Sequence, residues 1–226
     1  MSINEQGLSD RGLSDRGKRA FYQVVRAILL AVCKVAFRVR VHGRDKVPRS
    51  GAYVVAPSHR SIVDIFLTGF VTPRRIRFMA KQELFGNRVL AWLIDAGGGF
   101  AVDRDTADRA ALRAAQAALE GGEPVAVFPE GTRNTGPAIG DLFDGAAYLA
   151  TRLGVPVVPV AIGGSEEILP SGKSLPRLHR VAVVVGDPIL PPRREGRARR
   201  EEVKQMTGQL AVELQKRFDE ANALAD

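Results

Sequence analysis

The chain has 226 residues, of which 45% are hydrophobic and 26% charged, a composition typical of one globular domain and not of a disordered protein. Its single cysteine, Cys33, excludes an internal disulfide framework and a zinc site built from several thiolates. The net charge of +8 is concentrated in residues 1–80, which hold 15 basic and 5 acidic side chains. Such an excess attracts polyanions, either nucleic acid or an anionic membrane surface.

The first residues are polar as far as Lys18, and they contain the pentapeptide GLSDR twice in tandem. This composition predicts a disordered tail over residues 1–17. The same stretch lacks the pattern of a signal peptide, which favours a reducing location that faces the cytosol.

Residues 18–37 form a mostly apolar segment that Arg26 and Lys34 interrupt. A helix that spans a bilayer needs about 20 predominantly apolar residues with few charges, and this segment falls short of that. Because basic and apolar residues coincide, we expect a helix that lies in the interface of an anionic membrane, peripheral or monotopic on the cytoplasmic face of the cell membrane. A helix packed on the protein core is the alternative.

Seven short segments have the alternating or valine-rich pattern of β-strands. They are residues 37–43, 52–57, 76–81, 98–103, 124–129, 155–162 and 180–186. Helical patterns lie between some of them, at residues 106–121 and 144–154. The alternation predicts an α/β fold: a single domain over residues 38–192, with a mixed, largely parallel sheet of about seven strands flanked by helices.

Residues 193–226 comprise a basic link and a C-terminal amphipathic helix. Five apolar residues of this helix fall on one stripe: Val203, Met206, Leu210, Leu214 and Phe218. Such a stripe is typical of a surface that packs on the core rather than of a binding site.

The stretch SHRSIVDIF holds His59, one of only three histidines, and Asp64 five positions later. Within one regular helix these side chains would lie about 140° apart and would not meet. They can meet if His59 lies in a loop and Asp64 in the first turn of the next helix, with Ser58 or Ser61 as its cap. Asp64 would then orient the imidazole as a general base. The alternative is a histidine and an aspartate that only stabilise the helix N-terminus.

A second candidate site is the stretch FPEGTRN, which follows a valine-rich strand and contains Glu130, Gly131, Thr132 and Arg133. Ligands of open α/β sheets bind at the carboxyl ends of the strands. Glycine permits close approach of the backbone, while threonine and arginine suit a phosphate. Arg104, at the end of a glycine-led strand, is a third candidate. Plain turns with exposed charges are the alternative at both places.

Signatures of other chemistries are missing from the sequence. It has no GxxxxGK[ST] loop, no GxGxxG that opens a helix after a strand, no HExxH and no GxSxG. Cys33 lies in the apolar segment without a neighbouring base, which disfavours a thiolate nucleophile. The simplest remaining chemistry is direct: His59 deprotonates a substrate hydroxyl, which attacks an activated acyl group.

Four blocks in order resemble those of the glycerolipid acyltransferases, and most of all the bacterial 1-acyl-glycerol-3-phosphate acyltransferases. They are HRSIVD from His59, GGFAVDR ending at Arg104, FPEGTR from Phe128, and VPVVPV from Val155. Each block alone is a weak signal, but the four together cover residues 57–162 and strengthen the catalytic interpretation of His59.

The resemblance implies a role for each block. His59 would be the base and Asp64 its orienting partner. The implied ligands of the acceptor's phosphate and glycerol are Lys81, Arg104, Glu130, Gly131, Thr132 and Arg133. The residues implied on the acyl-chain side are Val157, Val158 and Pro159. One position departs from the pattern, because Asp144 stands where many members carry a lysine, which leaves one cation fewer for the acceptor headgroup.

The resemblance also implies the reaction. An acyl group would pass from acyl-CoA or acyl carrier protein to the sn-2 hydroxyl of the lysophospholipid 1-acyl-glycerol 3-phosphate, giving phosphatidic acid, with no bound cofactor and no metal. Glycerol 3-phosphate or another lysolipid is an alternative acceptor. A non-enzymatic, basic membrane-binding protein is an alternative of another class. Nucleic acid is disfavoured, because only 6% of the residues are aromatic and the basic excess overlaps the apolar segment.

Overall fold

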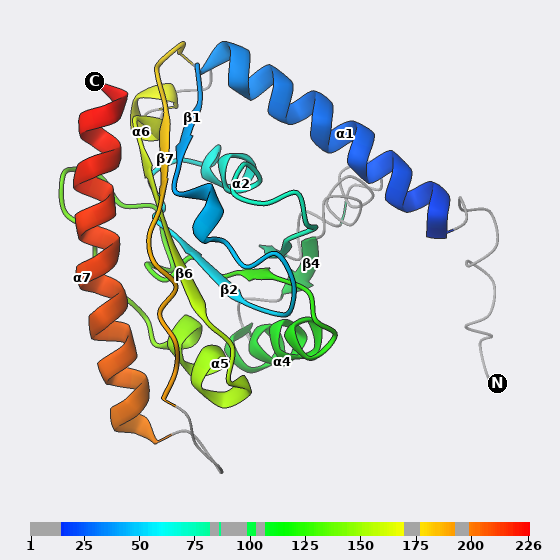
Figure 1. Ribbon diagram of the computed structural model, residues 1–226, viewed down its shortest axis with the longest axis vertical. Coiled ribbons are helices and arrows are strands. Elements are labelled where there is room, and N and C mark those ends of the chain that lie inside the picture. The colour runs from blue at the N-terminus through cyan, green and yellow to red at the C-terminus, as the bar shows by residue number, and fades with distance from the viewer. Residues whose placement is uncertain (1–14, 82–85, 87–98, 103–106, 170–176, 193–198) are drawn as a thin grey trace.

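Seven strands form one sheet in the computed structural model, which describes residues 15–81, 86, 99–102, 107–169, 177–192 and 199–226 (Figure 1). Their order is β1-β7-β6-β2-β5-β3-β4. The strands are β1 (Arg40–His42), β2 (Val54–Pro57), β3 (Arg77–Lys81), β4 (Gly99–Val102), β5 (Val125–Ala126), β6 (Val157–Gly163) and β7 (Ala182–Val185). Each overlaps one predicted segment. Among the described strand pairs only β6 and β7 run antiparallel, so the prediction of a mixed, largely parallel sheet is confirmed.

Helices cover both faces of the sheet. They are α1 (Asp15–Ala36), α2 (Asp64–Thr68), α4 (Ala107–Glu120), α5 (Gly145–Leu153), α6 (Ser165–Ile168) and α7 (Arg200–Ala225), with a 3-10 turn, η1, at Arg44–Lys46. Helices α4 and α5 match the two predicted helices. Figure 1 shows α7 along one side of the sheet and α1 with α2 on the other.

The central strands are buried on both sides, as their continuous apolar sequences predict. The adjacent residues Val54 and Val55 of β2 are both fully buried, but they belong to different clusters. Val55 packs on the side of the sheet that carries Leu67 of α2, whereas Val54 packs with Leu149 of α5. This alternation along a strand follows from its period of two residues.

Helix α7 lies along β6 and β7 (Figure 1). Its predicted apolar stripe is confirmed as packing surface, because all five of its residues are buried: Val203, Met206, Leu210, Leu214 and Phe218. Val203, Met206 and Leu210 pack in the cluster that contains Val54 of β2 and Leu149 of α5. Leu214 and Phe218 pack on the antiparallel strands β6 and β7.

Helix α1 begins at Asp15, so residues 15–17 are helical rather than part of the predicted disordered tail. The helix is clamped by Arg26, whose guanidinium donates to the carbonyl oxygens of Gly69 and Thr72. None of the helices in the described ranges is long and apolar enough to cross a bilayer.

Candidate active site

His59 and Asp64 meet at the carboxyl end of β2. His59 lies in the loop after the strand, and Asp64 is the first residue of α2. Nδ1 of His59 lies 3.1 Å from Oδ2 of Asp64. The Asp64 side chain is fully buried, whereas that of His59 is 16% exposed. The predicted loop-to-helix arrangement is confirmed, and Nε2 of the imidazole has no hydrogen-bond partner among the described residues.

The Asp64 carboxylate also organises the loop. Its Oδ2 accepts hydrogen bonds from the backbone amides of Arg60, at 2.6 Å, and Ser61, at 2.7 Å. The prediction that Ser58 or Ser61 caps α2 is wrong, because no side chain caps this helix and the Ser58 hydroxyl accepts from the amide of Ile162 at 2.9 Å. The two amides that donate to Asp64 precede the helix, and these bonds hold its carboxylate against the imidazole.

The loop after β5 holds the main chain of His59. Oε1 of Glu130 accepts from the His59 amide at 2.9 Å, and the amide of Asn134 donates to the His59 carbonyl at 2.9 Å. The Phe128 ring lies beside the imidazole, with 4.3 Å between the ring centroids. His59 is thus held through its side chain by α2 and through its backbone by the second predicted site.

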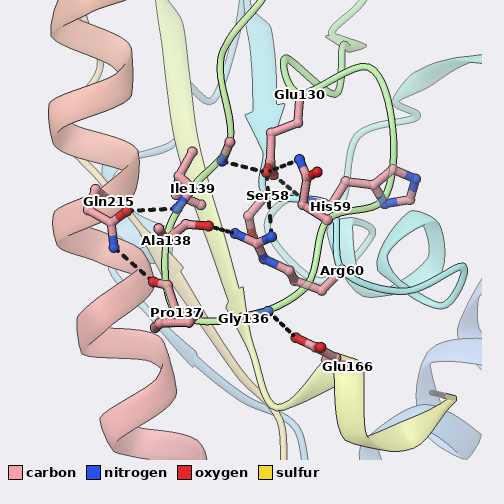
Figure 2. Close-up of polar contacts among 12 residues, drawn as sticks. Ser58, His59, Arg60, Glu130, Gly136, Pro137, Ala138, Ile139, Glu166 and Gln215 are labelled. Carbon is pink, nitrogen blue, oxygen red and sulfur yellow. Dashed lines mark hydrogen bonds and ion pairs between the residues drawn. The ribbon is translucent and has the colours of Figure 1, made fainter. Parts of the chain in front are cut away.

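The structure places Glu130 differently from the predicted acceptor ligand. Its side chain is fully buried, and its second oxygen, Oε2, accepts from Nδ2 of Asn134 at 2.7 Å and from the amide of Gly140 at 3.1 Å. The guanidinium of Arg60 lies 3.6 Å from the same oxygen. A carboxylate so enclosed supports the loop instead of facing a ligand, and Figure 2 shows it at the centre of these contacts.

Gly131, Thr132 and Arg133 form the exposed turn of this loop. Gly131 has a φ of +66°, and a Cβ atom on it would lie 2.8 Å from the Phe143 ring. The positive φ favours glycine at this position, and a larger residue would also have to displace the exposed Phe143 ring. The exposed side chains of Thr132 and Arg133 are open to a ligand, as the phosphate-binding prediction requires.

The remaining predicted cations belong to the neighbouring strands. Lys81 is the last residue of β3, and β3 runs parallel to β5 and β4, so it ends at the same edge of the sheet as His59. Arg104 lies outside the described residues, two positions beyond Val102, where β4 ends. Contact of either residue with a phosphate therefore stays a prediction.

Val157, Val158 and Pro159 are not at an open surface. The two valines are fully buried in β6 and pack in the core on opposite sides of the sheet, and Pro159 is buried as well. The prediction that these residues lie on the acyl-chain side stays a prediction, and their burial gives them a place in the core instead of an exposed surface. A central strand covered by helices on both sides turns its residues into the core.

Residues 38–163 match the model of the acyltransferase family. This range is more than half of the chain. The chain belongs to the acyltransferase family. The predicted resemblance is confirmed by this match and by the similarities to individual acyltransferases that follow.

Several of the similar proteins are acyltransferases of one kind. The 1-acyl-sn-glycerol-3-phosphate acyltransferase of Bacillus subtilis (strain 168) is 28% identical over 169 residues, which are 74% of this chain and 82% of the relative. The alpha form of the Homo sapiens enzyme of the same name is 34% identical over 151 residues, 64% of this chain and 53% of the relative. The crystal structure of the 1-acyl-sn-glycerophosphate acyltransferase PlsC from Thermotoga maritima matches with a TM-score of 0.72 and 28% identity, over 91% of this chain and 83% of that chain.

Asp144, where many acyltransferases carry a lysine, makes a contact of its own. Its Oδ1 accepts from the hydroxyl of Thr207 in α7 at 2.7 Å. The carboxylate thus joins the start of α5 to α7. The position supplies no cation to an acceptor, and the bond to Thr207 gives it a structural use in this acyltransferase.

Sequence reasoning missed Arg60. Its side chain is 1% exposed, its guanidinium donates to the carbonyl of Ala138 at 2.7 Å, and its Cζ lies 4.5 Å from the ring centroid of Phe218 in α7. Arginine is usually exposed, so composition and periodicity gave no sign of this burial. Its place inside the HRSIVD block was the one available hint. Among the described residues, no three metal-ligating side chains lie close enough together to hold a metal ion.

Proposed function

We propose that the protein transfers a fatty acyl group from an acyl thioester to the sn-2 hydroxyl of 1-acyl-glycerol 3-phosphate, giving phosphatidic acid. The observation that carries this proposal is the contact of 3.1 Å between His59 and Asp64. The names of the similar enzymes, one of which has a solved structure of the same fold, support the choice of acceptor.

The geometry suits direct general-base catalysis. Nε2 of His59 takes the proton of the acceptor hydroxyl while that oxygen attacks the thioester carbonyl. Asp64 holds the ring through Nδ1–H and stabilises the imidazolium that forms. The tetrahedral intermediate then collapses, the carbon–sulfur bond breaks, and the leaving sulfur takes the proton from the imidazolium. The products are a new ester and a free thiol, and the histidine returns to its starting state.

The substrates follow from the same arrangement. Thr132 and Arg133, exposed in the turn after β5, would bind the acceptor's phosphate together with Arg104 and Lys81. The donor would be acyl-CoA or acyl carrier protein. Because the thioester already activates the acyl group, His59 needs no bound cofactor for this step.

The outer side of α1 supports docking on a membrane. Val24, Ile28 and Val32 follow one another at intervals of four residues, which places them on one side of the helix. They are 57%, 60% and 58% exposed. Ile62 and Phe66, in the segment that carries Asp64, are 50% and 43% exposed. Apolar side chains beside a basic N-terminal third suit the interface of an anionic bilayer, and we place the enzyme peripherally or monotopically on the cytoplasmic face of the cell membrane.

The test uses purified protein in mixed micelles with palmitoyl- or oleoyl-CoA and 1-acyl-glycerol 3-phosphate. Thiol release and mass spectrometry of the lipid would follow the wild type, His59→Ala and the control His42→Ala, which changes an exposed histidine of β1. We expect phosphatidic acid from the wild type and the control, and none above background from His59→Ala.

Other outcomes would separate the alternatives. Turnover with glycerol 3-phosphate or a different lysolipid, but not with 1-acyl-glycerol 3-phosphate, would overturn the acceptor and keep the acyl transfer. No turnover with any acceptor, from either acyl-CoA or acyl carrier protein, would favour a non-enzymatic membrane-binding protein. Full activity of His59→Ala would overturn the mechanism.

A further inference from the structure

The loop of residues 134–140 continues from the turn that carries Thr132 and Arg133, and it has no regular secondary structure. Its sequence, NTGPAIG, is rich in small residues. It also meets the catalytic histidine directly, because the amide of Asn134 donates to the His59 carbonyl at 2.9 Å. Any shift of this loop therefore reaches the backbone of His59.

Side chains of α6, of α7 and of the preceding part of the same connection hold this loop through its backbone. Three of its amides donate to side-chain oxygens: Gly136 to Glu166 at 3.2 Å, Ile139 to Gln215 at 2.7 Å, and Gly140 to Glu130 at 3.1 Å. The loop has no strand or helix of its own to fix its backbone, so these side chains hold its shape.

Gln215 of α7 makes two of the loop's contacts. Its Oε1 accepts from the amide of Ile139 at 2.7 Å, and its Nε2 donates to the carbonyl of Pro137 at 3.2 Å. The same Nε2 donates to Asp219, one helical turn further along α7, at 2.7 Å. Figure 2 shows the Gln215 side chain bound to the loop through both its oxygen and its nitrogen. The bond to Asp219 holds the amide group in that orientation.

Arg60 carries the restraint from the middle of the loop to the catalytic residues. Its guanidinium donates to Ala138, which lies between the two loop residues that Gln215 binds, and its own amide donates to Asp64 at 2.6 Å. Figure 2 shows the Arg60 guanidinium and the His59 imidazole on opposite sides of their loop, with the guanidinium turned toward residues 137–139. The contacts form an unbroken series from α7 to the histidine.

We propose that Gln215 is a positioning residue of the acyltransferase site, through which α7 sets the loop of residues 134–140 and, through that loop, the backbone of His59. The proposal rests on the proposed function, and it extends the working site beyond the residues that match the family, 38–163, to a helix at residues 200–225. Gln215 touches no reacting atom; it acts through the loop.

The experiment compares Gln215→Met, which removes both polar contacts at similar size, with Gln209→Met as a control on an exposed position of the same helix. In the mixed-micelle assay we expect kcat of Gln215→Met to fall about tenfold, equivalent to about 1.4 kcal/mol, with KM for the acyl donor little changed. We expect Gln209→Met to match the wild type. Gln215→Glu keeps an oxygen for Ile139 but sets a carboxylate against Asp219 and the Pro137 carbonyl, so its kcat should fall at least as far as that of Gln215→Met.

Amide hydrogen exchange of the same proteins without substrate measures the loop itself. We expect faster exchange in Gln215→Met over residues 136–140 and at His59, and unchanged exchange in the core strands. The proposal is overturned if exchange in both segments stays at the wild-type rate, or if an active Gln215→Met keeps kcat within twofold of the wild type. A wild type without turnover would sink the proposed function alone, because exchange at His59 still decides whether Gln215 positions it.

Discussion

The loops around His59 and the outer side of α1 are built in opposite ways. Around His59, buried polar groups bind one another across β2, β5 and α7: Asp64 and Glu130 both have fully buried side chains with two or more partners each. On α1, Val24, Ile28 and Val32 are more than half exposed, while Arg26 clamps the helix to the segment after α2.

This difference indicates which region is stable in water without a further partner. Around His59, the buried carboxylates of Asp64 and Glu130 already hold the site loops through backbone amides, so a substrate meets a preformed geometry. The outer side of α1 leaves apolar area in water, and it gains free energy only when another phase covers it. The catalytic geometry should therefore be sensitive to single polar substitutions, whereas membrane docking should respond to the removal of apolar side chains.

The largest effect is expected at the catalytic pair. Asp64→Asn should lower kcat by a factor on the order of 10³, because the amide no longer fixes the imidazole tautomer or stabilises its charge. Asp45→Asn, in the exposed η1 turn, is the matched control and should change nothing. Thiol release in mixed micelles measures both. An Asp64→Asn enzyme within tenfold of the wild type would contradict the orienting role.

Next is the buried ion pair of Arg60 and Glu130, whose side chains are 1% and 0% exposed. Arg60→Met leaves the Glu130 carboxylate buried without its cation, and it should lower the free energy of unfolding by about 3 kcal/mol in urea denaturation. Adding Glu130→Gln removes that unpaired charge. The double variant should therefore be less destabilised than the sum of the two single variants, and strict additivity would show that the pair does not interact.

Docking should respond to the outer side of α1. The triple variant Val24→Asn, Ile28→Asn and Val32→Asn should lower partitioning onto anionic vesicles at least about tenfold, because less apolar surface leaves water. Val212→Asn on α7, at a position 73% exposed, is the control and should partition like the wild type. Substitution is a better test than deletion of α1. Cys33 of this helix is buried, and deleting it would expose part of the core. Equal partitioning of triple variant and wild type would refute docking by this surface.

The smallest effect concerns the inner side of α1. Burial raises the pKa of the Cys33 thiol, so at pH 8 less thiolate forms in the folded protein than in the unfolded chain. Alkylation by iodoacetamide should be at least about tenfold slower in buffer than in urea, and its rate should rise at a higher pH. Fast alkylation of the folded protein would mean that α1 detaches from the core. The helix would then have no permanently buried side and no permanently exposed side.

Local sequence determined much of this protein. Alternating or valine-rich patterns predicted all seven strands, and the period of the last helix predicted its buried stripe. The contact of His59 with Asp64 followed from their spacing of five positions and from a loop that precedes a helix. The order of four short blocks led to the family. The strands, the helix stripe and the His59–Asp64 pair each depend on the spacing of residues within one element or one loop, and the family follows from the order of the blocks.

Only the tertiary structure decided which side chains are buried and hold the site from the interior. Glu130 and Arg60 look like surface charges in the sequence, but the crossing of two loops buries them together. Val157 and Val158 became core because helices cover both sides of β6. Gln215 meets Ile139 across 76 positions of the chain, and no spacing rule relates residues so far apart. Packing brings such groups together, and the free energy of burying polar atoms then makes each depend on its partner.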